Sequence, residues 1–121
     1  MAACAFTASA ACVEVVDNCA TLLGSLSREL RYARALPPGT QSSFACPRER
    51  EVRAVLGASR QRVLNALGTP DRNTHGDDGA VVWTYVFRSK LQTGQDRGVP
   101  ELSFRFDAME QIAAVDCERS R

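Results

Sequence analysis

The sequence predicts an α+β domain in which a long N-terminal helix is followed by a helix–turn–helix pair packed on one face of a three-stranded antiparallel sheet. The spacing of apolar residues carries this prediction, because it changes from steps of three and four residues before Leu67 to steps of two after Ala80. Proline and glycine divide the helical part at residues 37–39, at Gly57 and at Gly68. A chain of 121 residues has room for one such domain.

The first element is an amphipathic helix expected over residues 12–34. Its apolar positions form an uninterrupted heptad seam at Cys12, Val16, Cys19, Leu23, Leu26, Leu30 and Ala33. The turn at residues 37–39 ends it. Residues 1–38 therefore form an N-terminal extension and helix, expected to make one compact unit with the α+β domain at residues 39–121. An intermolecular coiled coil is the alternative role for the seam.

Two short helices are expected next. Pro47 suits the first turn of a helix that ends at Gly57. Ser59 is the expected N-cap of a helix over residues 60–67, and Gly68 ends that helix.

The second half of the chain is expected to form the sheet. Residues 72–79 are polar and predict a loop or a hairpin turn. Strands are expected at residues 80–88, 101–107 and 111–117, and residues 107–110 make the tight turn between the last two.

Alternation within residues 101–107 gives the sheet an inner face and an open face. Phe104 and Phe106 must face the helices, so Arg105 lies on the open face. The strand at residues 80–88 is apolar on both sides, so either its aromatic residues or its valines join Arg105 there. Aromatic and arginine side chains together are typical of interface anchors. The candidate binding residues are Trp83, Tyr85, Phe87 and Arg105, with the core as the alternative position for the three aromatic residues.

Five cysteines are many for this chain length, and they lie at Cys4, Cys12, Cys19, Cys46 and Cys117. Without a CxxC pair and with one histidine, they suit disulfides in an oxidising compartment better than zinc, with reduced buried cysteines of a cytosolic protein as the alternative. On one helix, Cys12 and Cys19 would lie about 10.5 Å apart, which is too far for a mutual disulfide. We expect at least one disulfide, involving Cys46 and tying either the helix or the last strand. The candidates are Cys12, Cys19, Cys46 and Cys117.

Catalytic and metal-binding patterns are weak. His75 is the single histidine, and the acidic residues around it, Asp71, Asp77 and Asp78, suit a solvated loop better than a calcium loop. The sequence contains no nucleophile elbow, P-loop or dinucleotide glycine fingerprint. We therefore expect no enzymatic activity, no cofactor and no metal. No apolar run reaches the 18 residues that a spanning helix needs.

A nucleic-acid partner is disfavoured by the formal net charge of +1. The two short helices could nevertheless form a winged helix–turn–helix, with Arg60, Gln61 and Asn65 reaching the major groove. Residues 48–62 hold five arginines against two glutamates, which gives this interpretation a mild basic patch.

Several turn and strand motifs occur in a fixed order along residues 47–117. They are Gly57-Ala58-Ser59, Val63, Leu67-Gly68-Thr69-Pro70, Trp83-Thr84-Tyr85 and Phe106-Asp107. In this order they resemble the BamE family of small bacterial envelope domains, also called SmpA or OmlA, which shares its fold with the β-lactamase inhibitory protein. The chain departs from the family pattern at Glu110, where a glycine is usual before the last strand, and in the long helix before Cys46.

The resemblance implies a non-enzymatic protein-binding module of the bacterial cell envelope, periplasmic or associated with the outer membrane. Its partner would be another protein, either an envelope assembly component or, for an inhibitor or immunity protein, a target enzyme bound through the sheet. A winged-helix DNA-binding protein is the alternative of another class. A membrane would be contacted only through a lipid anchor. Cys4 and Cys12 are the candidate positions for that lipid, because each follows two alanines, as in a lipoprotein cleavage site. A plain N-terminal extension is the alternative.

Overall fold

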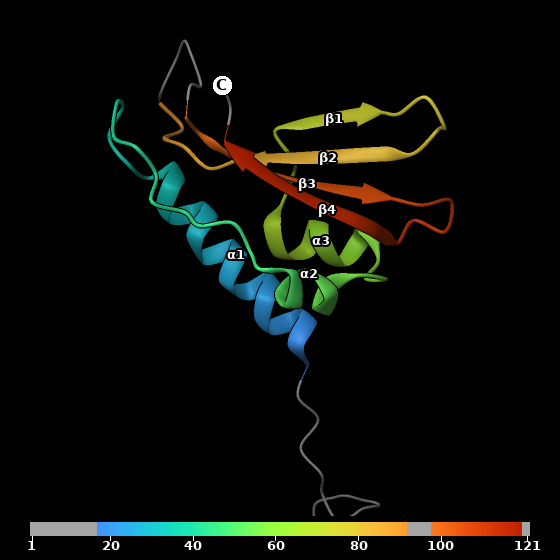
Figure 1. Cartoon of the computed structure of the whole chain (residues 1–121). Helices are drawn as coiled ribbons and strands as arrows, with labels where there is room; N and C mark the ends of the chain where they lie inside the picture. Colours follow the sequence, from blue (N-terminus) through green and yellow to red (C-terminus); the bar gives the residue numbers. More distant parts are fainter. Residues whose placement is uncertain (1–16, 92–97, 120–121) are drawn as a thin grey trace, which may run out of the picture.

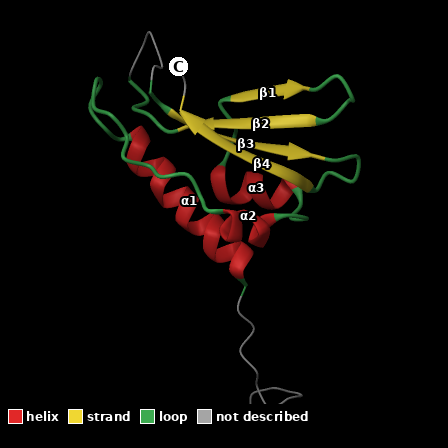
Figure 2. Cartoon of the chain, viewed as in Figure 1, coloured by secondary structure: helices red, strands yellow, loops and turns green. Residues whose placement is uncertain are grey.

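Three helices lie on one side of a four-stranded antiparallel sheet in this computed structural model, which describes residues 17–91 and 98–119 (Figure 1). The helices are α1 (Asn18–Arg34), α2 (Glu49–Val55) and α3 (Arg60–Leu67). The strands are β1 (Arg72–His75), β2 (Val81–Val86), β3 (Pro100–Phe106) and β4 (Ile112–Arg119), and each pairs with the next along the chain (Figure 2). The α+β class is confirmed, with one strand more than predicted.

Helix α1 begins at Asn18, because Asp17 is its N-cap and has an extended backbone. The Asp17 carboxylate accepts a hydrogen bond of 3.0 Å from the backbone N–H of Ala20. The prediction of a helix from residue 12 is therefore wrong at its start, and Cys12 and Val16 lie outside the described residues. Leu23, Leu26, Leu30 and Ala33 of the seam are buried as predicted, and Cys19 is partly buried. Leu22, which the seam did not include, is buried as well.

Both predicted short helices form, and α2 begins two residues later than predicted. Ser59 caps α3 by accepting a hydrogen bond of 3.1 Å from the backbone N–H of Arg62. Gly68 ends α3 at a φ of 78°, which favours glycine. Helix α2 begins at Glu49 rather than at Pro47, because the backbone N–H of Arg48 is bound by the side chain of Glu51 at 2.9 Å.

Strand β1 was predicted as a loop or a hairpin turn. All four of its residues are exposed and polar, so it has no hydrophobic alternation. It forms because the backbone pairs with β2, with Arg72 opposite Thr84 and His75 opposite Val81. The chain reverses at Gly79, whose φ is 82°.

Strand β4 is longer than predicted and contains a bulge. Arg105 pairs with Ala114 while Phe106 pairs with Ile112, so Ala113 is the extra residue. The bulge reverses the alternation and turns Ile112, which is 2% exposed, toward the core. The preceding turn places Glu110 at a φ of 60°, the position where the resembling family has glycine.

The aromatic residues of the sheet fill the core against α1 and α3. Trp83 meets Phe106 edge-on at 5.1 Å between ring centroids, and Tyr85 meets Phe104 at 5.9 Å. The Tyr85 hydroxyl donates a hydrogen bond of 2.8 Å to the backbone oxygen of Gly68. These residues and the leucines of α1 belong to one hydrophobic cluster, so α1 shares its core with the sheet.

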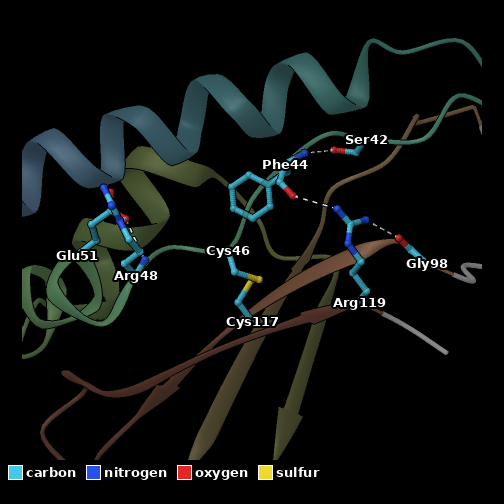
Figure 3. The surroundings of a disulfide bond; sticks show 8 residues. All are labelled: Ser42, Phe44, Cys46, Arg48, Glu51, Gly98, Cys117 and Arg119. Carbon is cyan, nitrogen blue, oxygen red and sulfur yellow. Dashed lines mark hydrogen bonds and ion pairs between the residues drawn. A yellow bond between two sulfur atoms is a disulfide. The ribbon is translucent and has the colours of Figure 1, made fainter.

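A disulfide joins Cys46, before α2, to Cys117 in β4 (Figure 3). The segment before Cys46 is also held by Phe44, whose ring stacks on Phe87 at 3.8 Å. The disulfide confirms the prediction that Cys46 forms a bond, here to the last strand. Cys19 is free, and Cys4 and Cys12 lie outside the described residues. The predicted absence of a Cys12–Cys19 bond likewise lies outside the described residues.

Candidate functional site

The face of the sheet that points away from the helices is the candidate site, and we call it the open face. None of the described helices packs on it (Figure 1). Strand register assigns it the following side chains: Arg72 and Thr74 of β1, Val82, Thr84 and Val86 of β2, Glu101, Ser103 and Arg105 of β3, and Ala114, Asp116 and Glu118 of β4. The open face is therefore mainly polar.

Two arginine–carboxylate pairs lie on the open face. Arg72 of β1 binds Glu101 of β3 at 2.5 Å between Nη2 and Oε1, so this pair spans β2. Arg105 of β3 binds Asp78, which lies in the turn between β1 and β2. The second pair therefore ties β3 to that turn. The side chains of Arg72 and Arg105 are 48% and 39% exposed, so both guanidinium groups can reach a partner.

Short polar contacts fill the centre of the open face. The hydroxyls of Thr84 and Ser103 lie 2.8 Å apart in a hydrogen bond across β2 and β3. Thr84 and Val86 are only 5% and 6% exposed, although they point away from the helices. The accessible part of the open face is therefore its charged groups.

Asp78 is the acidic group of the open face with a perturbed pKa. The backbone N–H of Ala80 donates to its carboxylate at 3.1 Å, and this hydrogen bond lowers the pKa most. The hydrogen bond from Arg105 lowers the pKa further. Asp78 therefore stays ionised and remains the partner of Arg105 well below neutral pH.

The structure separates the four residues that the sequence nominated for binding. Arg105 lies on the open face as predicted, opposite Val82. Trp83, Tyr85 and Phe87 are 8%, 0% and 0% exposed and belong to the core, so their placement as exposed anchors is wrong. The physical reason is register, because Trp83 pairs with Phe104 and Tyr85 with Leu102, and all four share the helix side of the sheet.

Trp83 carries the one buried side-chain polar atom without a hydrogen-bond partner among residues 17–91 and 98–119, its indole Nε1. The guanidinium of Arg60 lies 5.8 Å from the centre of its ring, which stabilises both groups through a cation–π contact. Arg60 also binds Glu110 at 2.9 Å. The candidate base-reading residue Arg60 is therefore engaged within the chain, whereas Gln61 and Asn65 are exposed and bind each other at 2.8 Å.

Sequence reasoning missed Arg72 and Asp78 as members of the site, whereas alternation along the strand placed Glu101 on the open face without identifying its partner. Arg72 was missed because β1 was not recognised, and Asp78 because its partner Arg105 comes from another strand. One available signal was Asp78-Gly79, a pair that favours a hairpin turn and so implies a strand before it as well as after it.

The acidic residues around His75 do not gather into a metal site. Within residues 17–91 and 98–119, no group of three or more histidine, cysteine, aspartate or glutamate side chains lies close enough to hold a metal ion. Asp71 instead accepts a hydrogen bond of 2.7 Å from the backbone N–H of Val86 and an ion pair of 3.4 Å from Arg34. Its role is to fasten the start of β1 to β2 and α1.

The helices of the described residues include none that is long and apolar enough to span a membrane. Comparisons of the chain with protein-family models, with curated proteins and with solved structures find no match.

Proposed function

We propose that this chain is a protein-binding module of the bacterial cell envelope that contacts its partner through the open face. One observation carries the proposal: a whole face of the sheet lacks a covering helix among the described elements and presents Arg72 and Arg105. Arginine is enriched in protein interfaces, and its planar guanidinium group can form two hydrogen bonds to one carboxylate. A partner carboxylate can replace Glu101 or Asp78 without leaving either guanidinium unpaired.

The disulfide supports a location outside the cytosol. Disulfides persist in oxidising compartments such as the periplasm. The Cys46–Cys117 disulfide ties the segment before α2 to β4. We propose a periplasmic or outer-membrane-associated location, with any membrane contact made through a lipid on Cys4 or Cys12. Mass spectrometry of the protein from native envelopes tests the anchor, since an acyl mass on neither cysteine contradicts it.

The resemblance to the BamE family supports a role like that of accessory lipoproteins of outer-membrane assembly. The order of α2, α3, β2, β3 and β4 agrees with the arrangement that the resemblance implies for residues 47–117. An inhibitor that blocks an enzyme through its sheet is the second form of the same proposal, because it uses the same open face. A DNA-binding role has less support, since Arg60 is engaged by Glu110 and Trp83.

Site-directed photo-crosslinking in native envelopes tests the proposal. A photo-reactive residue at Asp116, exposed on the open face, is compared with one at Arg53, exposed on α2. We expect specific protein adducts from Asp116 that are lost when Arg72→Ala and Arg105→Ala are combined. Outer-membrane assembly proteins in these adducts favour the assembly role, and a single lytic or toxic enzyme favours the inhibitor. Adducts from Arg53 alone, or none in the envelope, contradict the proposal.

A further inference from the structure

Almost all arginines in the described part of the chain contact a partner within it. Among residues 17–91 and 98–119, every arginine except Arg28 and Arg50 has a partner within the chain. An arginine near a carboxylate normally forms an ion pair, as Arg53 does with Glu49 at 2.8 Å on the same helix as Arg50. The two unengaged guanidinium groups are therefore a feature of the molecule that needs an explanation.

Arg28 of α1 and Arg50 of α2 line the same groove. Its volume is about 450 Å³, and its remaining wall includes Ser25 of α1 and Ala54 of α2. Leu22, which is 9% exposed, is also part of its lining. The groove thus combines two unpaired cationic groups, the carboxylate of Glu51 and a hydroxyl with a small apolar surface.

The groove continues along α1. A second hollow of about 330 Å³ shares Leu22, Ser25 and Glu51 with the first and extends to Phe44 and Pro47. Such an elongated depression between a helix and a neighbouring segment suits an extended chain better than a compact ion.

We propose that this groove binds an acidic segment of a partner protein, with one glutamate or aspartate side chain held by Arg28 and Arg50. Charge complementarity carries the choice of occupant, because a carboxylate accepts hydrogen bonds from both guanidinium groups and from the Ser25 hydroxyl. The inference rests on the proposed protein-binding function for the class of partner, but it concerns a surface distinct from the open face.

The acidic residues of the groove exclude a polyanion. Glu51 lines both hollows, and Glu29 lines the second one. A nucleic-acid backbone or another chain of phosphates would place further negative charge beside these carboxylates, and like charges at close range are destabilising. A segment with one acidic residue followed by neutral or basic residues avoids this repulsion.

A random dodecapeptide library displayed on phage tests the inference with the full chain as target. Selected peptides are synthesised, and their dissociation constants are measured by fluorescence anisotropy. We expect an acidic residue at a shared position, and a loss of affinity of about tenfold or more in Arg28→Gln, in Arg50→Gln, and when the acidic residue is changed to its amide. Arg31→Gln on α1 and Arg53→Gln on α2 are matched controls, exposed on the same helices but outside the groove lining, and should bind normally.

Three results overturn the inference. One is selection of peptides without a common acidic residue, or of none at all. Another is equal binding by Arg28→Gln, Arg50→Gln and the wild type. The third is displacement of the peptide by inorganic phosphate at equal concentration, which would make the groove an inorganic anion site. Because Arg28 and Arg50 have no partner to lose, Arg28→Gln and Arg50→Gln should melt with the wild type.

The fate of the open face is read separately. Peptides that depend on Arg28 should still bind when Arg72→Ala and Arg105→Ala are combined, and the crosslinks from Asp116 should persist in Arg28→Gln. Failure to select peptides that depend on Arg28 and Arg50, with the Asp116 crosslinks present, contradicts only the groove. Selection of such peptides without crosslinks from Asp116 contradicts only the proposed function.

Discussion

Removing the Cys46–Cys117 disulfide should lower the free energy of unfolding by about 4 kcal/mol. The two cysteines are 71 residues apart in sequence, so the bond closes most of the chain into one loop. In the chain-entropy model, closing a loop of this length removes about 15 cal/mol/K from the unfolded state, or about 4.4 kcal/mol at 25 °C. For a domain of this size, that loss corresponds to a fall of roughly 15 °C in Tm.

Urea denaturation of the Cys46→Ala, Cys117→Ala double variant measures this loss. Because the bond constrains the unfolded chain, we expect a lower midpoint and a larger m value, while the circular dichroism of the folded protein is unchanged. Cys19→Ala is the control, since Cys19 is free and partly buried and its loss should cost far less.

A difference below about 1 kcal/mol between the double variant and the wild type would refute the entropic argument. Thiol counting under denaturing, non-reducing conditions comes first. Protein from an oxidising compartment should show at most three reactive thiols, because five cysteines less the bonded pair leave three. Five reactive thiols would refute the bond itself.

Three further predictions concern single residues. Trp83→Ala should lower the free energy of unfolding by about 3–5 kcal/mol in urea denaturation. Trp83→Phe should lower it clearly less, because phenylalanine keeps an aromatic ring in the core and removes the unpaired indole N–H. Equal losses in the two variants would contradict this. Glu110→Gly should be more stable than Glu110→Ala by about 1 kcal/mol in the same assay. Both variants lose the ion pair to Arg60, but only glycine adopts a φ of 60° without backbone strain. A more stable alanine variant would contradict this backbone strain. The pKa of Asp17 is lowered in the folded protein, first by the hydrogen bond from the backbone N–H of Ala20 and then by Arg62. The ionised Asp17 carboxylate therefore stabilises the fold fully above the unfolded pKa of 3.8, and this stabilisation is lost as pH falls through the lower folded pKa. Tm measured against pH should therefore fall less steeply below about pH 4 in Asp17→Asn than in the wild type, and parallel curves would contradict the assignment.

Elements with their own periodicity were predictable. The seam from Cys19 to Ala33 and the alternation of Phe104 and Phe106 specify a face, and the structure buries those faces. Ser59 and Gly68 were predictable as the ends of α3 because capping depends on local backbone chemistry.

Features that depend on a neighbour were not predictable. Strand β1 has no apolar residue and exists only as the partner of β2. The start of α1 was missed for a different reason: the Asp17 cap is local, but the heptad seam continues past it and so predicts an earlier start. The inward side of Trp83 required the register of β2 against β3, and either choice satisfied the alternation of a strand that is apolar on both sides.

The partners of residues in the groove and on the open face could not be predicted from the sequence for the same reason. Arg105 was placed by alternation within its own strand, but its partner Asp78 comes from a turn 27 residues earlier in the chain. Arg28 and Arg50 stand out only after the partners of the other arginines are known. A residue that lacks a partner cannot be recognised from composition.

The position of the disulfide also sets the order in which the protein can be completed. The chain is made from its N-terminus, so α1, α2 and α3 emerge before β2, β3 and β4, whose aromatic residues cover their apolar faces. Cys46 has to wait for Cys117, which lies in the last strand. Until then the sheet under the leucines of α1 lacks its fourth strand, and the bond cannot form. A nascent chain is therefore vulnerable to aggregation and proteases until β4 has been made.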